Sequence, residues 1–135
     1  MSRDLIESGL GWSWQSGRVM ARIRSQDTMV LTARDREQVI GFAIMEFAEL
    51  EAHLDLLAVL PSYRRAGIGR RLIQWLEKSA RVAGTFMVHL EVRISNRSAQ
   101  AFYRALSYQQ MAWVPRYYGG YEDAVRMAHD LRVRR

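Results

Sequence analysis

Two glycines lie between two pairs of arginines at residues 64–71, which read RRAGIGRR. An apolar, strand-like run precedes this segment, and a helical pattern begins at Gly67. The first N–H groups of a helix lack partners within the helix, and the helix dipole favours negative charge there. Glycines also let a bulky anion approach the backbone closely. The segment therefore predicts a cradle for a pyrophosphate group; the plain alternative is a turn with exposed arginines.

Two better-known phosphate motifs do not fit this segment. The dinucleotide fingerprint Gly-x-Gly-x-x-Gly fails because position 72 is leucine, and the Gly-Lys-Ser/Thr of a P-loop is missing. The elements around the segment are therefore needed to interpret it.

The elements before and through the segment follow from hydrophobic periodicity. Residues 29–33 and 39–47 are strand-like, with a turn at 35–38, and the apolar run at 53–60 ends at Pro61 as a buried strand would. From Gly67 apolar residues recur every three or four positions until Gly84, which predicts an amphipathic helix with a glycine stop.

The second half of the chain alternates in the same way. Residues 86–92 form a strand whose apolar side chains face away from His89 and Glu91, and residues 98–106 form a helix. Strands at 108–114 and 124–131 follow, joined by an aromatic, glycine-rich loop at 116–121. Near the N-terminus, 4–8 and 18–25 are expected to be short helices. This order predicts one domain over 1–135, of class α/β or α+β with a mixed sheet.

Composition narrows the function. The chain has 135 residues, a net charge of +6 and no cysteine, which excludes disulfides, thiolate metal sites and a cysteine nucleophile. With three histidines, a histidine metal cluster is not expected. No apolar run is long enough to span a membrane and the N-terminus lacks a signal-peptide pattern, so we expect a cytoplasmic protein without a membrane partner. Lys78 is the single lysine, which argues against broad nucleic-acid binding.

Three blocks of sequence resemble the GNAT acetyltransferase family. Residues 56–73, LLAVLPSYRRAGIGRRLI, are similar to its acetyl-CoA-binding segment, with the pattern Arg64-x-x-Gly67-x-Gly69. Residues 90–108, LEVRISNRSAQAFYRALSY, resemble the next block of the family. Residues 116–127, RYYGGYEDAVRM, are similar to the RimI-type branch, which acetylates the N-terminal amines of proteins.

The resemblance implies an α+β fold with a central, mixed, mostly antiparallel twisted sheet flanked by helices. The chain is expected to lack the family's usual first strand, which would affect the acceptor site. Ser107 stands where the family has a helix-ending glycine, and a left-handed serine would cost about 1 kcal/mol.

The resemblance also implies a role for each candidate residue. Glu91 would be the general base that deprotonates the amine, and Tyr103 would protonate the leaving thiolate, since a phenol and a thiol have comparable pKa values. Tyr117 and Tyr118 would line the acceptor site. Acetyl-CoA would be the co-substrate, with no metal, and its contacts would come from Leu57, Ala58, Val59, Arg64, Arg65, Ala66, Gly67, Ile68, Gly69, Arg70, Asn96 and Tyr103.

Each role has a plainer alternative. Glu91 could be a strand carboxylate paired with Arg93 or another arginine, and Tyr103 could be a core aromatic. Asp55 or His89 could replace Glu91 as the base, acting through a water. At the level of function, the sequence leaves open a small-amine acetyltransferase and a non-catalytic acetyl-CoA-binding protein beside the protein N-terminal acetyltransferase. The acceptor's identity and a homodimer are also left open.

Overall fold

The computed structural model describes residues 27–64 and 66–132, and the backbone of residues 13–14, 18–19 and 24–25. Seven strands form one sheet in the order β3-β4-β5-β6-β7-β9-β8, and β1 and β2 form a separate pair. Neighbouring strands are antiparallel throughout the sheet except for β6 and β7. The elements are β1 (Ser13–Trp14), β2 (Arg18–Val19), β3 (Arg24–Ser25), β4 (Thr28–Asp35), β5 (Gln38–Phe47), β6 (Glu51–Val59), the 3-10 turn η2 (Pro61–Tyr63), α1 (Ile68–Val82), β7 (Met87–Arg93), α2 (Arg97–Ala105), β8 (Gln109–Tyr118) and β9 (Glu122–Asp130).

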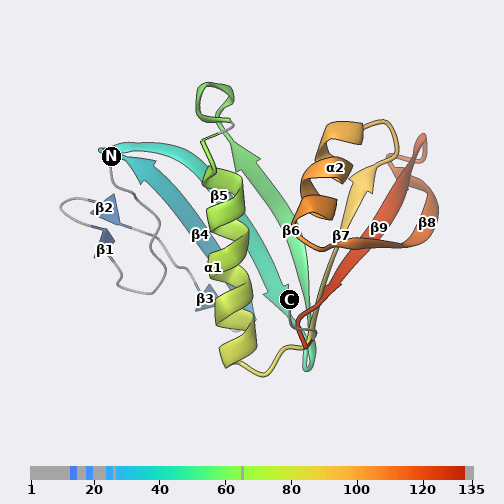
Figure 1. The fold of residues 1–135 in the computed structure, drawn as a ribbon, viewed down its shortest axis with the longest axis horizontal. Coiled ribbons are helices and arrows are strands. Elements are labelled where there is room, and N and C mark those ends of the chain that lie inside the picture. The colour runs from blue at the N-terminus through green and yellow to red at the C-terminus, as the bar shows by residue number, and fades with distance from the viewer. Residues whose placement is uncertain (1–12, 15–17, 20–23, 26, 65, 133–135) are drawn as a thin grey trace.

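Helix α1 lies across β4, β5 and β6, and α2 lies beside β7 (Figure 1). The buried side of α1 carries Leu72, Ile73 and Leu76, which are fully enclosed by the sheet's apolar residues. Strand β7 contributes Val88 and Leu90 to the same core, so its alternate residues face the other way. Among the described residues, no helix is long and apolar enough to cross a membrane.

The strands and helices after residue 28 largely agree with the sequence prediction, and Ser107 has the left-handed φ of 78° expected for it. Two predictions were wrong. Residues 18–25 are not a helix, because 18–19 and 24–25 are strands that pair with β1 and β4. Residues 116–118 are not loop, because β8 continues to Tyr118 and pairs with Glu122 of β9. In both cases pairing with another strand overrides local propensity. The helix expected at 4–8 lies outside the described residues.

The sheet divides between β6 and β7 (Figure 1). These strands pair in parallel at three positions, which end at His53 and His89, although β6 continues to Val59 and β7 to Arg93. A bulge at Asp55 in β6 accompanies the divergence, since Leu54 and Leu56 pair with consecutive residues of β5. Beyond His53, the side of β6 that faces β7 is therefore not paired with that strand, and its backbone can bind a ligand.

Candidate active site

The first part of the site is the turn that leads from β6 into α1. Gly67 precedes the helix with a left-handed φ of 81°, and a Cβ atom added there would meet nothing within 4 Å. The turn is therefore open where α1 begins, and the first backbone N–H groups of a helix lack partners within the helix, which suits an anion. Gly69 has a different reason to be glycine, because its Cβ would lie 3.1 Å from the Phe102 ring of α2.

A cavity of about 830 Å³ begins at this turn and runs between β6 and α2. Ten of the predicted cofactor residues line it: Leu57, Ala58, Val59, Arg64, Gly67, Ile68, Gly69, Arg70, Asn96 and Tyr103. Ala66 is not part of the lining, and Arg65 lies outside the described residues. Sequence analysis missed six lining residues, among them Tyr63 and Phe102. A volume of this size, with arginines at one end and apolar walls, fits a ligand such as acetyl-CoA.

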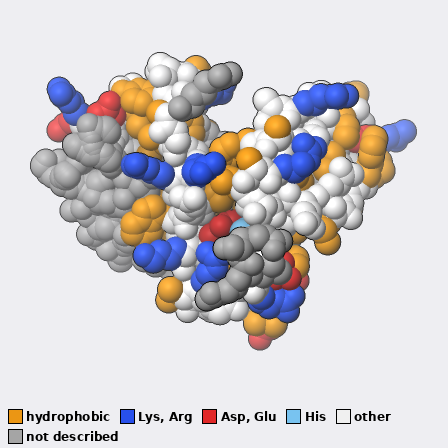
Figure 2. Space-filling model, viewed as in Figure 1, with side chains coloured by type: hydrophobic (Ala, Val, Ile, Leu, Met, Phe, Trp, Pro, Cys, Tyr) orange, Lys and Arg blue, Asp and Glu red, His pale blue; other side chains and the backbone are white. Residues whose placement is uncertain are grey.

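The surface view shows this region as a groove between the two lobes that carry α1 and α2 (Figure 2). Lysine and arginine side chains gather on both walls of the groove, and acidic and histidine side chains are visible at its floor. The groove therefore offers positive charge to phosphates at its rim.

Tyr103 lies on α2 at the wall of the cavity, and 9% of its surface is exposed. Its ring packs edge to face against Phe102 and Tyr108. Burial, with a smaller contribution from Tyr118, raises the pKa of Tyr103 to about 12. The phenol therefore carries its proton across the physiological range, but burial makes it a weaker acid than a free phenol, so its pKa is no longer comparable to that of a thiol.

Asn96 caps the N-terminus of α2. Its side-chain oxygen accepts a hydrogen bond of 3.0 Å from the backbone N–H of Ala99 and one of 3.2 Å from the hydroxyl of Ser98. Since the oxygen is engaged, the predicted contact to the cofactor would fall to the amide nitrogen. Gln100 holds the same helix to the end of β7 by donating to the carbonyls of Arg93 and Ile94.

Glu91 is the centre of a polar cluster on the opposite face of β7 from Leu90. Its side chain is 5% exposed. One carboxylate oxygen lies 2.5 Å from Nε2 of His53 and 3.2 Å from the Tyr117 hydroxyl, and the other accepts a 2.7 Å bond from Nε of Arg126. Burial acts to raise the pKa of Glu91, but the hydrogen bonds and charges of Arg126 and His53 outweigh it, and the pKa is lowered.

His53 is a further residue of this cluster that the sequence did not predict. Its Nδ1 lies 2.5 Å from a carboxylate oxygen of Asp55, so the imidazole bridges Asp55 and Glu91. Burial acts to lower the pKa of His53, but hydrogen bonds and charges from the two carboxylates outweigh it and the pKa is raised. Alternation along β6 could have placed His53 and Asp55 near each other, but not beside Glu91, which lies 38 residues further along the chain.

The remaining predicted residues lie around this cluster. The hydroxyl of Tyr117 binds Glu91, and the rings of Tyr117 and Tyr118 pack edge to face. The guanidinium carbon of Arg93 lies over the Tyr118 ring, 4.3 Å from the centre of that ring. Arg93 pairs with Glu122 and not with Glu91. The arginine that pairs with Glu91 is Arg126. His89 lies next to His53 on β7, with Nε2 3.1 Å from Glu51.

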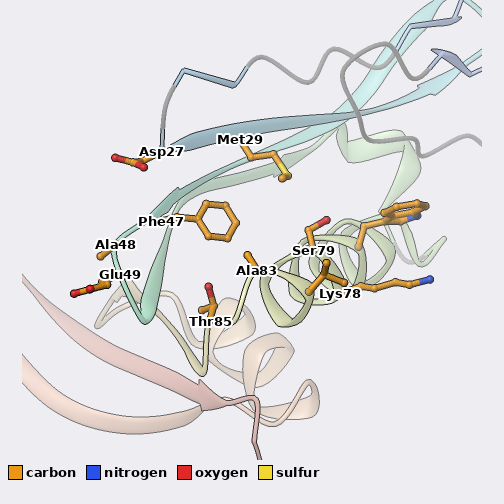
Figure 3. A pocket seen from close by; sticks show the side chains of 11 residues that line it. Asp27, Met29, Phe47, Ala48, Glu49, Lys78, Ser79, Ala83 and Thr85 are labelled. Carbon is orange, nitrogen blue, oxygen red and sulfur yellow. The ribbon is translucent and has the colours of Figure 1, made fainter.

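A second pocket, of about 540 Å³, lies between the end of β5 and the C-terminal half of α1 (Figure 3). Phe47, Ser79 and Thr85 are among its lining residues. None of the predicted site residues that the structure describes belongs to it. The first cavity is therefore the candidate for the reaction.

The chain is similar to known proteins over much of its length. A family model described as the acetyltransferase (GNAT) family matches residues 3–108. The [ribosomal protein bS18]-alanine N-acetyltransferase of Salmonella typhimurium is 39% identical over 101 residues, which cover 73% of this chain and 67% of that protein. An N-alpha-acetyltransferase of Sulfurisphaera tokodaii is 39% identical over 82 residues, 60% of this chain and 49% of that one. This chain thus spans about two thirds or less of these curated relatives.

Among solved structures, the ribosomal-protein-S18-alanine N-acetyltransferase from Escherichia coli is similar, with a TM-score of 0.74 and 30% identity. The alignment covers 83% of this chain and 74% of that one. The mixed, mostly antiparallel sheet with flanking helices that the sequence predicted is therefore also the fold of this relative.

Proposed function

Since the chain belongs to the acetyltransferase (GNAT) family, we propose that it transfers an acetyl group from acetyl-CoA to the N-terminal amine of a protein. The observation that carries the proposal is that β6 supplies both His53, which contacts Glu91 where β6 and β7 diverge, and residues 57–59, which line the cavity. A thioester held in the cavity and an amine held by the acidic cluster could approach each other through this opening in the sheet.

The turn before α1 supports the binding of acetyl-CoA. Arg64 and Arg70 supply positive charge beside Gly67, and the first N–H groups of α1 can receive the pyrophosphate. Residues 57–59 supply backbone groups for the extended pantetheine arm and the thioester carbonyl. A carbonyl polarised by a fixed N–H is more easily attacked, because negative charge develops on its oxygen in the transition state.

The acidic cluster supports the activation of an amine. An α-amino group has a pKa of about 8 and is mostly protonated at neutral pH, so carboxylates attract it but the proton must leave before attack. The Glu91–His53 pair accepts that proton, directly or through a water. The free amine then attacks the thioester carbon, and the carbon–sulfur bond breaks.

Tyr103, in the wall of the cavity, completes the reaction. The departing thiolate takes the phenolic proton of Tyr103, and the product carries the acetyl group on its nitrogen. Tyr103 regains a proton from solvent, and the Glu91–His53 pair releases its own. The attacking nitrogen also gives up a proton to solvent as the amide forms, which balances the proton that Tyr103 takes from solvent. One proton is therefore released per turnover, the one that the ammonium form of the acceptor loses.

A protein N-terminus is the preferred acceptor because two relatives above 35% identity are named for N-terminal or alanine N-acetylation. The aromatic side chains of Tyr117 and Tyr118 lie beside Glu91, where they can contact the first residues of a peptide. A cytoplasmic location fits such an acceptor and stays a prediction, as does a homodimer.

The test is turnover of acetyl-CoA over a library of N-terminal peptides and a panel of small amines. We expect acetylation of peptides whose α-amine is free, and none when the same peptides are blocked at the N-terminus. Turnover of small amines alone would instead support the small-amine acetyltransferase. Acetyl-CoA binding without turnover of any acceptor would support the non-catalytic alternative.

A further inference from the structure

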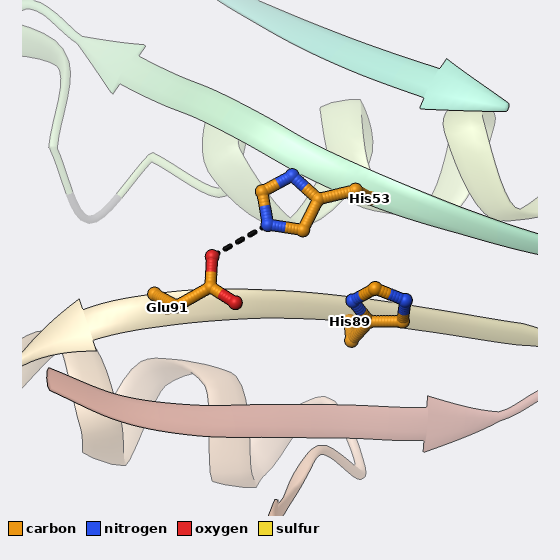
Figure 4. Close-up of side chains that lie close together, drawn as sticks. All are labelled: His53, His89 and Glu91. Atoms are coloured by element: carbon orange, nitrogen blue, oxygen red, sulfur yellow. Dashed lines mark hydrogen bonds and ion pairs between the residues drawn. The ribbon is translucent and has the colours of Figure 1, made fainter. Parts of the chain in front are cut away.

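Two histidines and a glutamate converge at the point where β6 and β7 separate (Figure 4). His53 and His89 are paired positions of the two strands, and Glu91 lies two residues beyond His89 on the same face of β7. One ligand atom from each of the three side chains lies within 4.8 Å of those from the other two. Imidazole nitrogens with a carboxylate oxygen are a ligand set that Zn²⁺ and similar divalent ions prefer.

Each histidine is oriented by a carboxylate on its far nitrogen. Asp55 lies 2.5 Å from Nδ1 of His53, and Glu51 lies 3.1 Å from Nε2 of His89. The nitrogens left for the centre are Nε2 of His53 and Nδ1 of His89. In metal sites a carboxylate that binds the other ring nitrogen of a histidine ligand fixes the tautomer and raises the basicity of the nitrogen that binds the metal.

The Nδ1 atom of His89 provides an independent indication. It is buried, and among the described residues it has no hydrogen-bond partner. A buried polar atom without a partner costs free energy, and a metal ion would satisfy it. The His89 ring lies beside the Glu91–His53 pair, so a metal ion bound by that pair would also be close to this nitrogen (Figure 4).

The charge around the cluster favours a dication. Glu51, Asp55 and Glu91 each touch one of the two histidines, and Arg126 is the cation that faces Glu91. Glu46 adds a further carboxyl next to Asp55, whose hydrogen bond and charge raise the pKa of Glu46. With neutral imidazoles, the three contacting carboxylates and one guanidinium leave an excess of two negative charges.

We propose that His53, His89 and Glu91 form a binding site for Zn²⁺ or a closely similar divalent transition-metal ion. The three side chains are the protein ligands, and a water takes the remaining tetrahedral position. Zinc bonds of about 2.0–2.2 Å in tetrahedral geometry place two ligand atoms about 3.4 Å apart, so a separation as wide as 4.8 Å shortens by about 1.4 Å on binding. His89 can make that movement, because its side chain is 29% exposed.

The ion has a consequence for catalysis, and this part rests on the proposed function. It occupies the atoms that would accept the proton of the amine, so zinc inhibits acetyl transfer. Because the ligand atoms are outside the cavity that holds acetyl-CoA, inhibition is competitive with the peptide acceptor and not with acetyl-CoA.

The binding test needs neither substrate nor turnover. Zinc chloride is titrated into metal-free protein by calorimetry, for wild type, His89→Gln and Glu51→Gln. We expect one zinc per chain in wild type, at least tenfold weaker binding in His89→Gln, and weakening of about tenfold to a hundredfold in Glu51→Gln. Equal affinity in wild type and His89→Gln, with both folded by thermal melting, overturns the proposal, as does the absence of zinc binding to wild type.

Two controls show whether any loss is specific. His129→Gln removes the third histidine, which is bound to Glu77 away from the cluster, and Glu122→Gln removes a carboxylate paired with Arg93. Both should bind zinc as wild type does; equal weakening in a folded control contradicts the site. Zinc that binds at this site without competing with the peptide acceptor would leave the metal site standing and count against the proposed location of the amine.

Discussion

Nε2 of His53 lies 2.5 Å from a carboxylate oxygen of Glu91, although 38 residues separate them in the chain. The contact spans the last paired position of β6 and β7, just before the two strands diverge. It therefore places the pair that we propose as the proton acceptor at the point where the two strands separate.

The turn before α1 should be required for binding acetyl-CoA. Gly67→Val forces a β-branched residue into a left-handed backbone and fills the space in front of the helix N-terminus. We expect calorimetry to detect no binding in the folded variant. Gly84→Val is the matched control, because Gly84 also has a positive φ and open space but lies at the far end of α1. Gly84→Val should lose stability yet bind acetyl-CoA normally; unchanged affinity in Gly67→Val would contradict the cradle.

Tyr103→Phe should lower kcat by about tenfold to a thousandfold, the range for loss of one proton-transfer group. Acetyl-CoA affinity should change little, because the ring and its packing remain. Tyr108→Phe is the control: its hydroxyl donates to Glu77, so we expect a stability loss of about 1–3 kcal/mol and a normal kcat. Equal kcat in wild type and Tyr103→Phe would make Tyr103 a packing residue.

Glu91→Gln should depress kcat/KM most at and below neutral pH. There the amine is protonated and needs a base, whereas above its pKa of about 8 the free amine is abundant and the deficit should shrink. The measurement is a pH–rate profile of both proteins beside a thermal melt of each. Parallel profiles displaced by a constant factor would indicate a structural role for Glu91, and the base would then be sought in Asp55 or His89.

Glu91 and His53 should behave as one unit in a double-mutant cycle. If both residues hold the same proton, His53→Gln and Glu91→Gln should each remove most of the contribution that this base makes to kcat/KM. The double variant should then lose much less than the product of the two single losses in kcat/KM. Multiplicative losses would show that the two residues act independently.

Glu122 should contribute stability that depends on pH. Hydrogen bonds from Ser95 and Arg93 lower its pKa, so its contribution is present above the ordinary glutamate value of about 4.5 and is lost as pH falls through the lowered value. We expect Glu122→Gln to melt below wild type at pH 7 and the difference to vanish under acid. A constant difference in Tm down to about pH 2 would contradict this assignment.

The sequence alone determined the elements whose signals are local. Glycines at 67 and 84 bound the helix α1, alternation in β7 placed Glu91 opposite Leu90, and the arginine-flanked turn predicted the anion end of a cavity that the structure contains. These patterns depend on residues a few positions apart in the chain, so they can be recognised without knowledge of the fold. The same local reading failed at 18–25 and 116–118, where strand pairing decides the backbone.

The tertiary structure alone decided what surrounds Glu91. His53, Tyr117 and Arg126 come from β6, β8 and β9, and they meet on one carboxylate because of the register between strands and the divergence of β6 from β7. A shift of one residue in either register would turn His53 or Arg126 to the other face of the sheet. Periodicity within a strand shows which residues share a face, but not which residue of another strand lies opposite.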